Sequence, residues 1–274
     1  MYSSVYGDNV GVIMYMPSIS GEVTLNGISQ VGYAYDKPMR NVNILGRQTS
    51  DMIMNGPLEV SLTVNKLFQE GELLVKNTGR NDLIAYVGHN MNSSIIDLDS
   101  IQTTGGAIQS LSVSATAGDI PSLSADIIFS DSRFYNNDAN GIAYSGAPDL
   151  AYVPPTGVRL NLGYSSNVLI SANYTANFNW VKEGRVGTDL SGDNRFMMEL
   201  VRPVEYTASV EMAIDTYRIS AFSFQNSKTW ELSIHSDTAL IHTFALENAE
   251  LVGESVNLNA EGLQTVTLNY RGVG

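Results

Sequence analysis

The sequence contains no cysteine, which excludes a disulfide framework, a thiol nucleophile and a thiolate metal site. Charged residues make up only 16% of the chain, and the long Ala-, Glu-, Lys- and Leu-rich stretches that mark helix bundles are missing. No run approaches the ~18 apolar residues of a membrane helix. The opening residues MYSSVYGDNVGVIMYMPS lack a basic start and carry Asp8 within their apolar stretch, so we expect no secretory signal.

Motifs that would indicate catalysis or a bound ion are also missing. The sequence has no G-x-S-x-G elbow, no P-loop and no H-E-x-x-H pattern. Asp97 and Asp99 would point the same way on a strand, but such a pair is typical of solvated strand ends. Two acidic loops, 136–141 (NNDANG) and 189–194 (DLSGDN), lack the ligand series of an EF-hand. The histidines show no metal-site spacing: His89, His235 and His242. We therefore expect no catalytic residue, cofactor or metal.

The residues that are abundant favour strands and turns. Fourteen Tyr and 24 Gly accompany many Ser, Thr, Asn and Val, which are typical of short strands and the turns between them. The 274 residues allow one large or two ordinary domains, and 43% apolar residues can form a sizeable core. The composition therefore predicts an all-β protein.

The net charge of −13 argues against a protein that grips nucleic acid, because such proteins usually carry a basic patch. An acidic surface of this kind serves either general solubility or the repulsion of phosphate. Composition alone leaves both interpretations open.

Two segments of the chain repeat one pattern. Gly56 to Asn65 reads GPLEVSLTVN, and Arg202 to Glu211 reads RPVEYTASVE. Each has Pro, an aliphatic residue and Glu, followed by strict alternation of polar and apolar residues. Period-2 alternation predicts a half-buried strand. Pro57 and Pro203 suit the first position of that strand, where a missing N–H costs least.

Further landmarks recur in the same order. Both halves have an Ile-Ser pair at Ile28 and Ile170, and both have a Ser-rich alternating segment, SLSVSA from Ser110 and SVNLNA from Ser255. A Gly-containing turn and a second alternating strand follow each segment, which predicts a β-hairpin. The offsets are 142, 146 and 145 residues for Ile28, Pro57 and Ser110. The ordered recurrence predicts an internal duplication.

The duplication predicts four segments along the chain. We expect an N-terminal arm over 1–12, a first module over 13–131, a Pro- and Gly-rich linker over 132–156 and a second module over 157–274. Each module could carry one short helix, for which the candidates are 81–86 and 236–241.

The repeated strand phrases resemble those of a known family. The phrase Arg202-Pro203-Val204-Glu205 before an alternating strand, with an Ile-Ser-x-x-Tyr strand upstream, resembles phage tail tube proteins. The first half has Gly56-Pro57-Leu58-Glu59 in the same place, with Gly instead of Arg. The resemblance implies two related β-sandwich or barrel modules, and rings that stack into a hollow tube. Six modules normally complete a ring, so three chains would form a pseudo-sixfold one.

The resemblance also implies partners and a role for two acids. Glu59 and Glu205 occupy matching places and would line the lumen, where acids repel DNA phosphates over about 8 Å. The alternative is a salt bridge of each acid, for example with Arg47 and Arg185. Partners would be copies of the chain itself and the tail sheath, tape measure, baseplate or terminator proteins. Genomic DNA would pass without specific binding, and no membrane would be involved. The protein would belong to the virion tail and assemble in the host cytoplasm, with the arm and the loop near Gly192 joining stacked rings.

Three other functions remain open at this stage. A hub or terminator protein of a tail would share the fold but cap a tube without polymerising. A carbohydrate-binding module or adhesin could use Trp180, Trp230 and the many tyrosines as a sugar-stacking face, although tryptophans in all-β chains are more often core or interface residues. An outer-membrane barrel also alternates, but it needs export and an apolar outer band.

Overall fold

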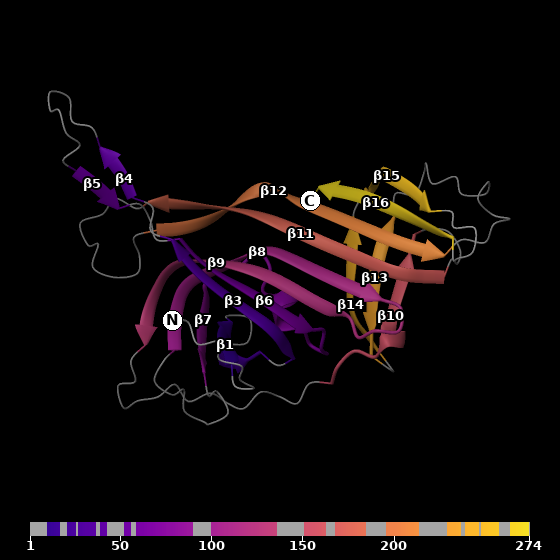
Figure 1. Cartoon of the computed structure of the whole chain (residues 1–274), viewed down its shortest axis with the longest axis horizontal. Helices are drawn as coiled ribbons and strands as arrows, with labels where there is room; N and C mark the ends of the chain where they lie inside the picture. Colours follow the sequence, from indigo (N-terminus) through magenta and orange to yellow (C-terminus); the bar gives the residue numbers. More distant parts are fainter. Residues whose placement is uncertain are drawn as a thin grey trace.

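A computed structural model of the chain (Figure 1) is all-β apart from one turn of α-helix and one 3-10 turn in the residues it describes, as the composition predicts. The described residues are 10–16, 21–25, 27–36, 39–42, 52–55, 59–89, 100–135, 151–162, 168–184, 196–213, 229–236, 239–246, 248–257 and 264–273.

The first half of the chain supplies nine strands and the helical turn. They are β1 (Val10–Met16), β2 (Gly21–Thr24), β3 (Ile28–Asp36), β4 (Met39–Val42), β5 (Met52–Asn55), β6 (Glu59–Leu67), α1 (Leu73–Lys76), β7 (Leu83–His89), β8 (Ser100–Thr116) and β9 (Ser122–Tyr135). The second half supplies the 3-10 turn (Pro155–Gly157) and the strands β10 (Val158–Asn161), β11 (Val168–Gly184), β12 (Phe196–Ala213), β13 (Trp230–His235), β14 (Leu240–Leu246), β15 (Glu250–Asn257) and β16 (Thr265–Val273).

One antiparallel sheet runs through both halves of the chain. Eight of its strands follow one another in the order β3-β6-β9-β8-β11-β12-β16-β15. The early part of β8 also pairs with β7, which extends the sheet to β1 and β2. β8 and β11 pair from Ser110 opposite Asn177 to Thr116 opposite Ser171, and this junction joins the two halves. β4 and β5 pair only with each other among the described strands and form a hairpin that projects from one end of the body (Figure 1).

The four strands of each half are paired in the same order and register. In these registers β6 corresponds to β12 at an offset of 146 residues and β3 to β11 at 141, and β8 and β9 correspond to β15 and β16 at 143. The bulges coincide as well, at Ser29 and its counterpart Ile170, and at Gln109 and its counterpart Val252. Strand pairing thus repeats down to the irregular positions.

The structure corrects two of the three offsets expected from sequence. The offset of 146 that makes Glu59 and Glu205 equivalent agrees with the registers. The counterpart of Ser110 is Gly253, two residues before the expected Ser255. A two-residue slip keeps every side chain on its face, so the alternation of the sequence is the same in both registers. The Ile-Ser strands differ by one residue from the expected offset, because sequence does not show where a bulge falls.

The core lies on one face of the large sheet, against a second sheet. The three-stranded sheet β10-β13-β14 crosses behind β11 and β12 (Figure 1). Its inward residues Trp230, Leu232 and Ile234 are fully buried. Trp230 stacks on Tyr174 of β11 with ring centroids 5.8 Å apart. Phe68 and Phe244 meet edge to face at 6.1 Å, so the two halves share one hydrophobic core.

Both predicted helices are wrong. The segment 81–86 runs into β7, which pairs with β1 on one side and β8 on the other. Within 236–241 the described residues form a tight turn, in which Ser236 N–H donates to the carbonyl of Ala239, and β14 begins at Leu240. Ladder hydrogen bonds with neighbouring strands override weak local helix preference in both places. The helical turn lies elsewhere, at Leu73–Lys76, with the Glu72 side chain accepting from Leu74 N–H.

Several predicted boundaries differ from the strands. β1 begins at Val10, inside the expected arm, and buries Val12. β9 continues to Tyr135, inside the expected linker. Pro203 does not begin a strand, because it lies within β12 beside the register shift opposite Asn177 and Asn179. A bulge of this kind accommodates the missing N–H of proline. Pro57 lies outside the described residues.

Candidate functional site

The face of the large sheet opposite the core is polar across the eight strands β3-β6-β9-β8-β11-β12-β16-β15, four from each half. Over the segments named below, alternation puts every second residue of each strand on this face, and none of the residues named is buried. Most are Ser, Thr, Asn or Gln. The residues are Gln30, Gly32, Ala34, Asp36, Glu59, Ser61, Thr63, Asn65, Ser122, Ser124, Asp126, Ile128, Ser110, Ser112, Ser114, Thr116, Ser171, Asn173, Thr175, Asn177, Glu205, Thr207, Ser209, Glu211, Thr265, Thr267, Asn269, Arg271, Glu250, Gly253, Ser255 and Asn257. We call this surface the polar face.

Side-chain hydrogen bonds connect the strands of the polar face. Both carboxylate oxygens of Asp126 accept hydrogen bonds, from the Thr63 hydroxyl at 2.7 Å and the Ser110 hydroxyl at 2.8 Å. Across the junction of the halves, the hydroxyls of Ser112 and Thr175 lie 2.9 Å apart. These bonds hold the short polar side chains in fixed positions, so the surface is ordered as well as hydrophilic.

The ionised side chains of the polar face are mainly acidic. Among the residues named above, Arg271 is the basic one, and the acids are Asp36, Glu59, Asp126, Glu205, Glu211 and Glu250. A second basic side chain, Lys182, lines the depression that contains Glu59. The acids occur on both halves, so the negative charge is spread over the sheet.

Glu59 lies at the start of β6, exposed and opposite Asp36 of β3. It lines a depression of about 650 Å³ whose other wall includes Trp180 and Lys182 of β11. The Lys182 ammonium donates to the carbonyl of Phe129 at 2.7 Å. Burial lowers the pKa of Lys182, and the nearby Glu59 carboxylate opposes that effect. Arg47, the salt-bridge partner expected for Glu59, lies outside the described residues.

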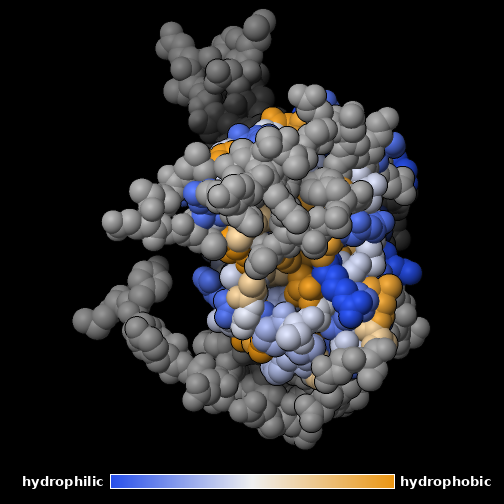
Figure 2. Space-filling view, turned by 90° about the vertical axis from the view of Figure 1, so that its right-hand side faces the viewer, coloured by the Kyte–Doolittle hydropathy of each residue, from blue (hydrophilic) through white to orange (hydrophobic). Residues whose placement is uncertain are grey.

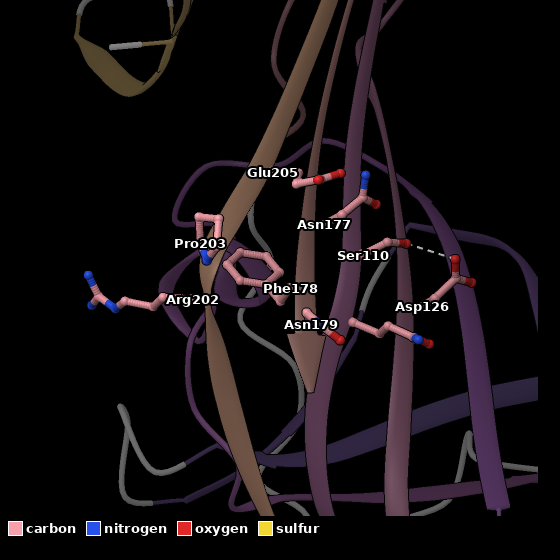
Figure 3. Close-up of a pocket in the computed structure, with 9 residues that line it drawn as sticks. Ser110, Asp126, Asn177, Phe178, Asn179, Arg202, Pro203 and Glu205 are labelled. Atoms are coloured by element: carbon pink, nitrogen blue, oxygen red, sulfur yellow. Dashed lines mark hydrogen bonds between the residues drawn. The ribbon is translucent and has the colours of Figure 1, made fainter. Parts of the chain in front are cut away.

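Glu205 lies at the matching place on β12 and lines a second depression, of about 580 Å³. In Figure 3, Arg202 points away from the side where Glu205, Asn177, Ser110 and Asp126 gather. Glu205 forms an ion pair with Arg271 at 3.1 Å, with both side chains more than half exposed. Such a surface pair contributes at most about 1 kcal/mol. The partner is therefore Arg271, whereas Arg185, which the sequence suggested, lies outside the described residues.

The first and last of these eight strands each have one edge without a partner strand in the described part of the chain. β3 pairs with β6 alone, and β15 pairs with β16 alone. Free edges present unpaired N–H and C=O groups that can pair with another chain. Exposed apolar side chains lie on both strands, Tyr35 on β3 and Val252 and Val256 on β15.

The tryptophans do not form a sugar-stacking face. Trp230 is fully buried in the core, and Trp180 is half-buried with its indole N–H donating to the carbonyl of Ile108 at 2.8 Å.

Within the described ranges, no group of three or more His, Asp or Glu side chains could hold a metal ion. The acidic loops 136–141 and 189–194, the pair Asp97 and Asp99, and Gly192 lie outside those ranges.

His242 of β14 is a half-buried structural residue whose ring packs edge to face on Phe244, with centroids 4.5 Å apart. Burial lowers the pKa of His242 below its ordinary value of 6.5. The unfolded chain therefore binds this proton more readily than the folded chain, and stability falls as pH drops through about 6.5.

We expect His242→Asn to weaken this pH dependence. Urea unfolding at several pH values between about 7.5 and 5.5 would measure it for both proteins. The difference between the two profiles isolates the imidazole, because the carboxylates are common to both. Equal slopes in the two proteins would contradict the assignment.

The end of the molecule shown in Figure 2 exposes hydrophilic and hydrophobic residues side by side in its described part. Among the described residues, no helix has the length and apolar character needed to cross a membrane.

A scan against protein-family models and a search of curated proteins find no match to this chain.

Proposed function

We propose that the chain is a structural subunit of a phage tail tube that assembles with copies of itself into stacked rings. The observation that carries the proposal is a four-strand unit present twice in one eight-strand arrangement, with one polar face, one core face and, among the described residues, a free edge at each end. A sheet with two free edges can be extended by further copies, and a ring closes when the rotation between copies allows it. Resemblance of the strand phrases around Glu59 and Glu205 to tail tube proteins supports the same function.

The dimensions of such a ring suit a channel. Three chains with eight of these strands each would form a barrel of about 24 strands. With strands ~4.8 Å apart and tilted by about 40°, the backbone diameter of the barrel is about 48 Å. A barrel of this width encloses a channel, because side chains can fill the interior only of barrels of about eight strands.

The polar face supplies the chemistry expected of the channel wall. Duplex DNA carries about one negative charge per 1.7 Å of axis, and basic side chains would hold it. Short hydroxyl and amide side chains interspersed with carboxylates offer little attraction to phosphate. DNA would therefore slide past Glu59 and Glu205 without adhering.

Electron microscopy of concentrated protein, with native mass spectrometry of the same sample, tests the proposal. We expect hollow tubes or sixfold-looking rings with the mass of three chains. Discrete monomers at every concentration would contradict it and favour a capping part or a binding module.

The double variant Glu59→Lys/Glu205→Lys tests the role of the two acids in the channel. Both side chains are exposed, so we expect the fold to tolerate the change. Tubes of this variant should retain short duplex DNA at low salt and release it as salt is raised, whereas tubes of the unchanged protein should not retain it. Anisotropy of labelled DNA measures this. As a control, Glu231→Lys changes an acid on the separate three-stranded sheet. If tubes of the control variant retain as much DNA as tubes of the double variant, the idea that Glu59 and Glu205 line the channel is contradicted.

A further inference from the structure

We propose that β15 of one chain pairs with β3 of the next, antiparallel and in the register that β8 and β11 use within the chain. The proposal rests on the tail tube function above and names the contact by which its rings close. Because β15 corresponds to β8 and β3 to β11, the junction inside the chain is a template for the junction between chains. Transferring its register places Gly253 opposite Asp36, Ser255 opposite Ala34 and Asn257 opposite Gly32.

The two free edges have the shapes of the two sides of the internal junction. β3 carries a bulge at Ser29 where β11 carries one at Ile170. β15 carries a bulge at Val252 where β8 carries one at Gln109. Bulges bend a strand and increase its twist. Matching bulges therefore give both edges the curvature that already fits in the β8–β11 pair.

Equivalent core-facing side chains are buried at the internal junction and exposed at the free edges. Val113 of β8 is 1% exposed at the internal junction, whereas its counterpart Val256 on β15 is 42% exposed. Ala176 of β11 is 2% exposed, whereas its counterpart Tyr35 on β3 is 64% exposed. These core-facing side chains are buried where a neighbouring strand is present and uncovered where it is absent.

One pair of side chains differs between the two junctions in a complementary way. Leu111 and Ala176 are opposite one another inside the chain, and their counterparts are Glu254 and Tyr35. The phenol of Tyr35 can donate a hydrogen bond to the Glu254 carboxylate across the proposed junction. A charge facing inward on an edge strand also discourages pairing with unrelated strands. Replacement of an apolar pair by this polar one favours a specific partner.

The occupant of each edge is a second copy of this chain. One chain carries both sides of the contact, at opposite ends of the same sheet, so every copy added leaves the same free edge for the next. This is a heterologous contact, which generates a closed ring or an open filament according to the rotation between copies.

Disulfide cross-linking tests the register, since the chain has no cysteine of its own. Two double variants match the proposed register, Ala34→Cys/Ser255→Cys and Gly32→Cys/Asn257→Cys. A third, Gly32→Cys/Ser255→Cys, reuses the same substitutions but represents a slip of two residues. Ser112→Cys/Thr175→Cys is the internal reference, because those hydroxyls lie 2.9 Å apart and the cross-link forms within one chain.

We expect both matched variants to form covalent oligomers on a non-reducing gel under mild oxidation of concentrated protein. The slipped variant should remain at least tenfold less cross-linked. Oligomers of the slipped variant instead, or tubes in the microscope without cross-links in either matched variant, would overturn the register and leave the tail tube function standing. Matched cross-links in open filaments would support the edge contact and contradict the closed tube. Protein that stays monomeric at all concentrations would overturn both.

Discussion

Val256→Asp should abolish assembly while leaving the folded chain intact. Val256 is 42% exposed on the free edge of β15, so we expect the substitution to change the stability of a single chain by about 1 kcal/mol. In the proposed junction it takes the place of the fully buried Val113, where an aspartate would be a buried and unpaired charge. An unpaired buried charge costs several kcal/mol, which is a loss of at least a hundredfold in association at each junction.

Light scattering and electron microscopy at matched concentrations would measure the loss, and far-UV circular dichroism would confirm that the variant is folded. Leu240→Asp is the matched control, because Leu240 is an exposed apolar residue on β14, a strand of the three-stranded sheet and neither of the two edge strands β3 and β15. The control should assemble normally. Equal loss of assembly in both variants would mean that acidic charge at any exposed site disrupts tubes, and Val256→Asp that still assembles would exclude the β15 edge from the contact.

Glu72→Gln should reduce the free energy of unfolding by about 3–5 kcal/mol. The Glu72 carboxylate lies 2.6 Å from the Lys66 ammonium, and both side chains are almost completely buried. Gln69 also accepts from Lys66, and the second oxygen of Glu72 accepts from Leu74 N–H at the start of α1. Glutamine preserves the volume and the cap but leaves the Lys66 charge without its counter-ion inside the core. Urea unfolding of dilute protein would measure the change.

The double variant Lys66→Met/Glu72→Gln separates charge from packing. The register of β3 and β6 against β11 and β12 makes Met212 the counterpart of Lys66, so the same position in the second half already holds methionine. Removal of both charges should recover most of the lost stability, because buried pairs contribute little net energy compared with apolar residues of similar volume. If the double variant is as unstable as Glu72→Gln, the cost lies in the hydrogen bonds and not in the unpaired ammonium.

The fold class, the faces of the main strands and the equivalence of Glu59 with Glu205 could be predicted from the amino-acid sequence. Alternation of apolar and polar residues from Val60 to Val64 and from Tyr206 to Val210 reports which side of a strand meets the core, because successive side chains point to opposite faces. The repeated Pro-aliphatic-Glu phrase aligned these two strands at the offset of 146 that the strand pairing has.

Which strands are neighbours, and in which register, depends on contacts between distant parts of the chain and could not be predicted from the sequence. The segment 83–89 is a strand because β1 and β8 lie beside it, and no feature of its own sequence records those neighbours. Ser110 matches Gly253 and not Ser255, since a two-residue slip leaves the alternation unchanged and only the ladder with β16 distinguishes the two. Arg271 reaches Glu205 across 66 residues of sequence because β16 pairs with β12. The free edges of β3 and β15 follow from the same non-local pairing, which local sequence does not encode.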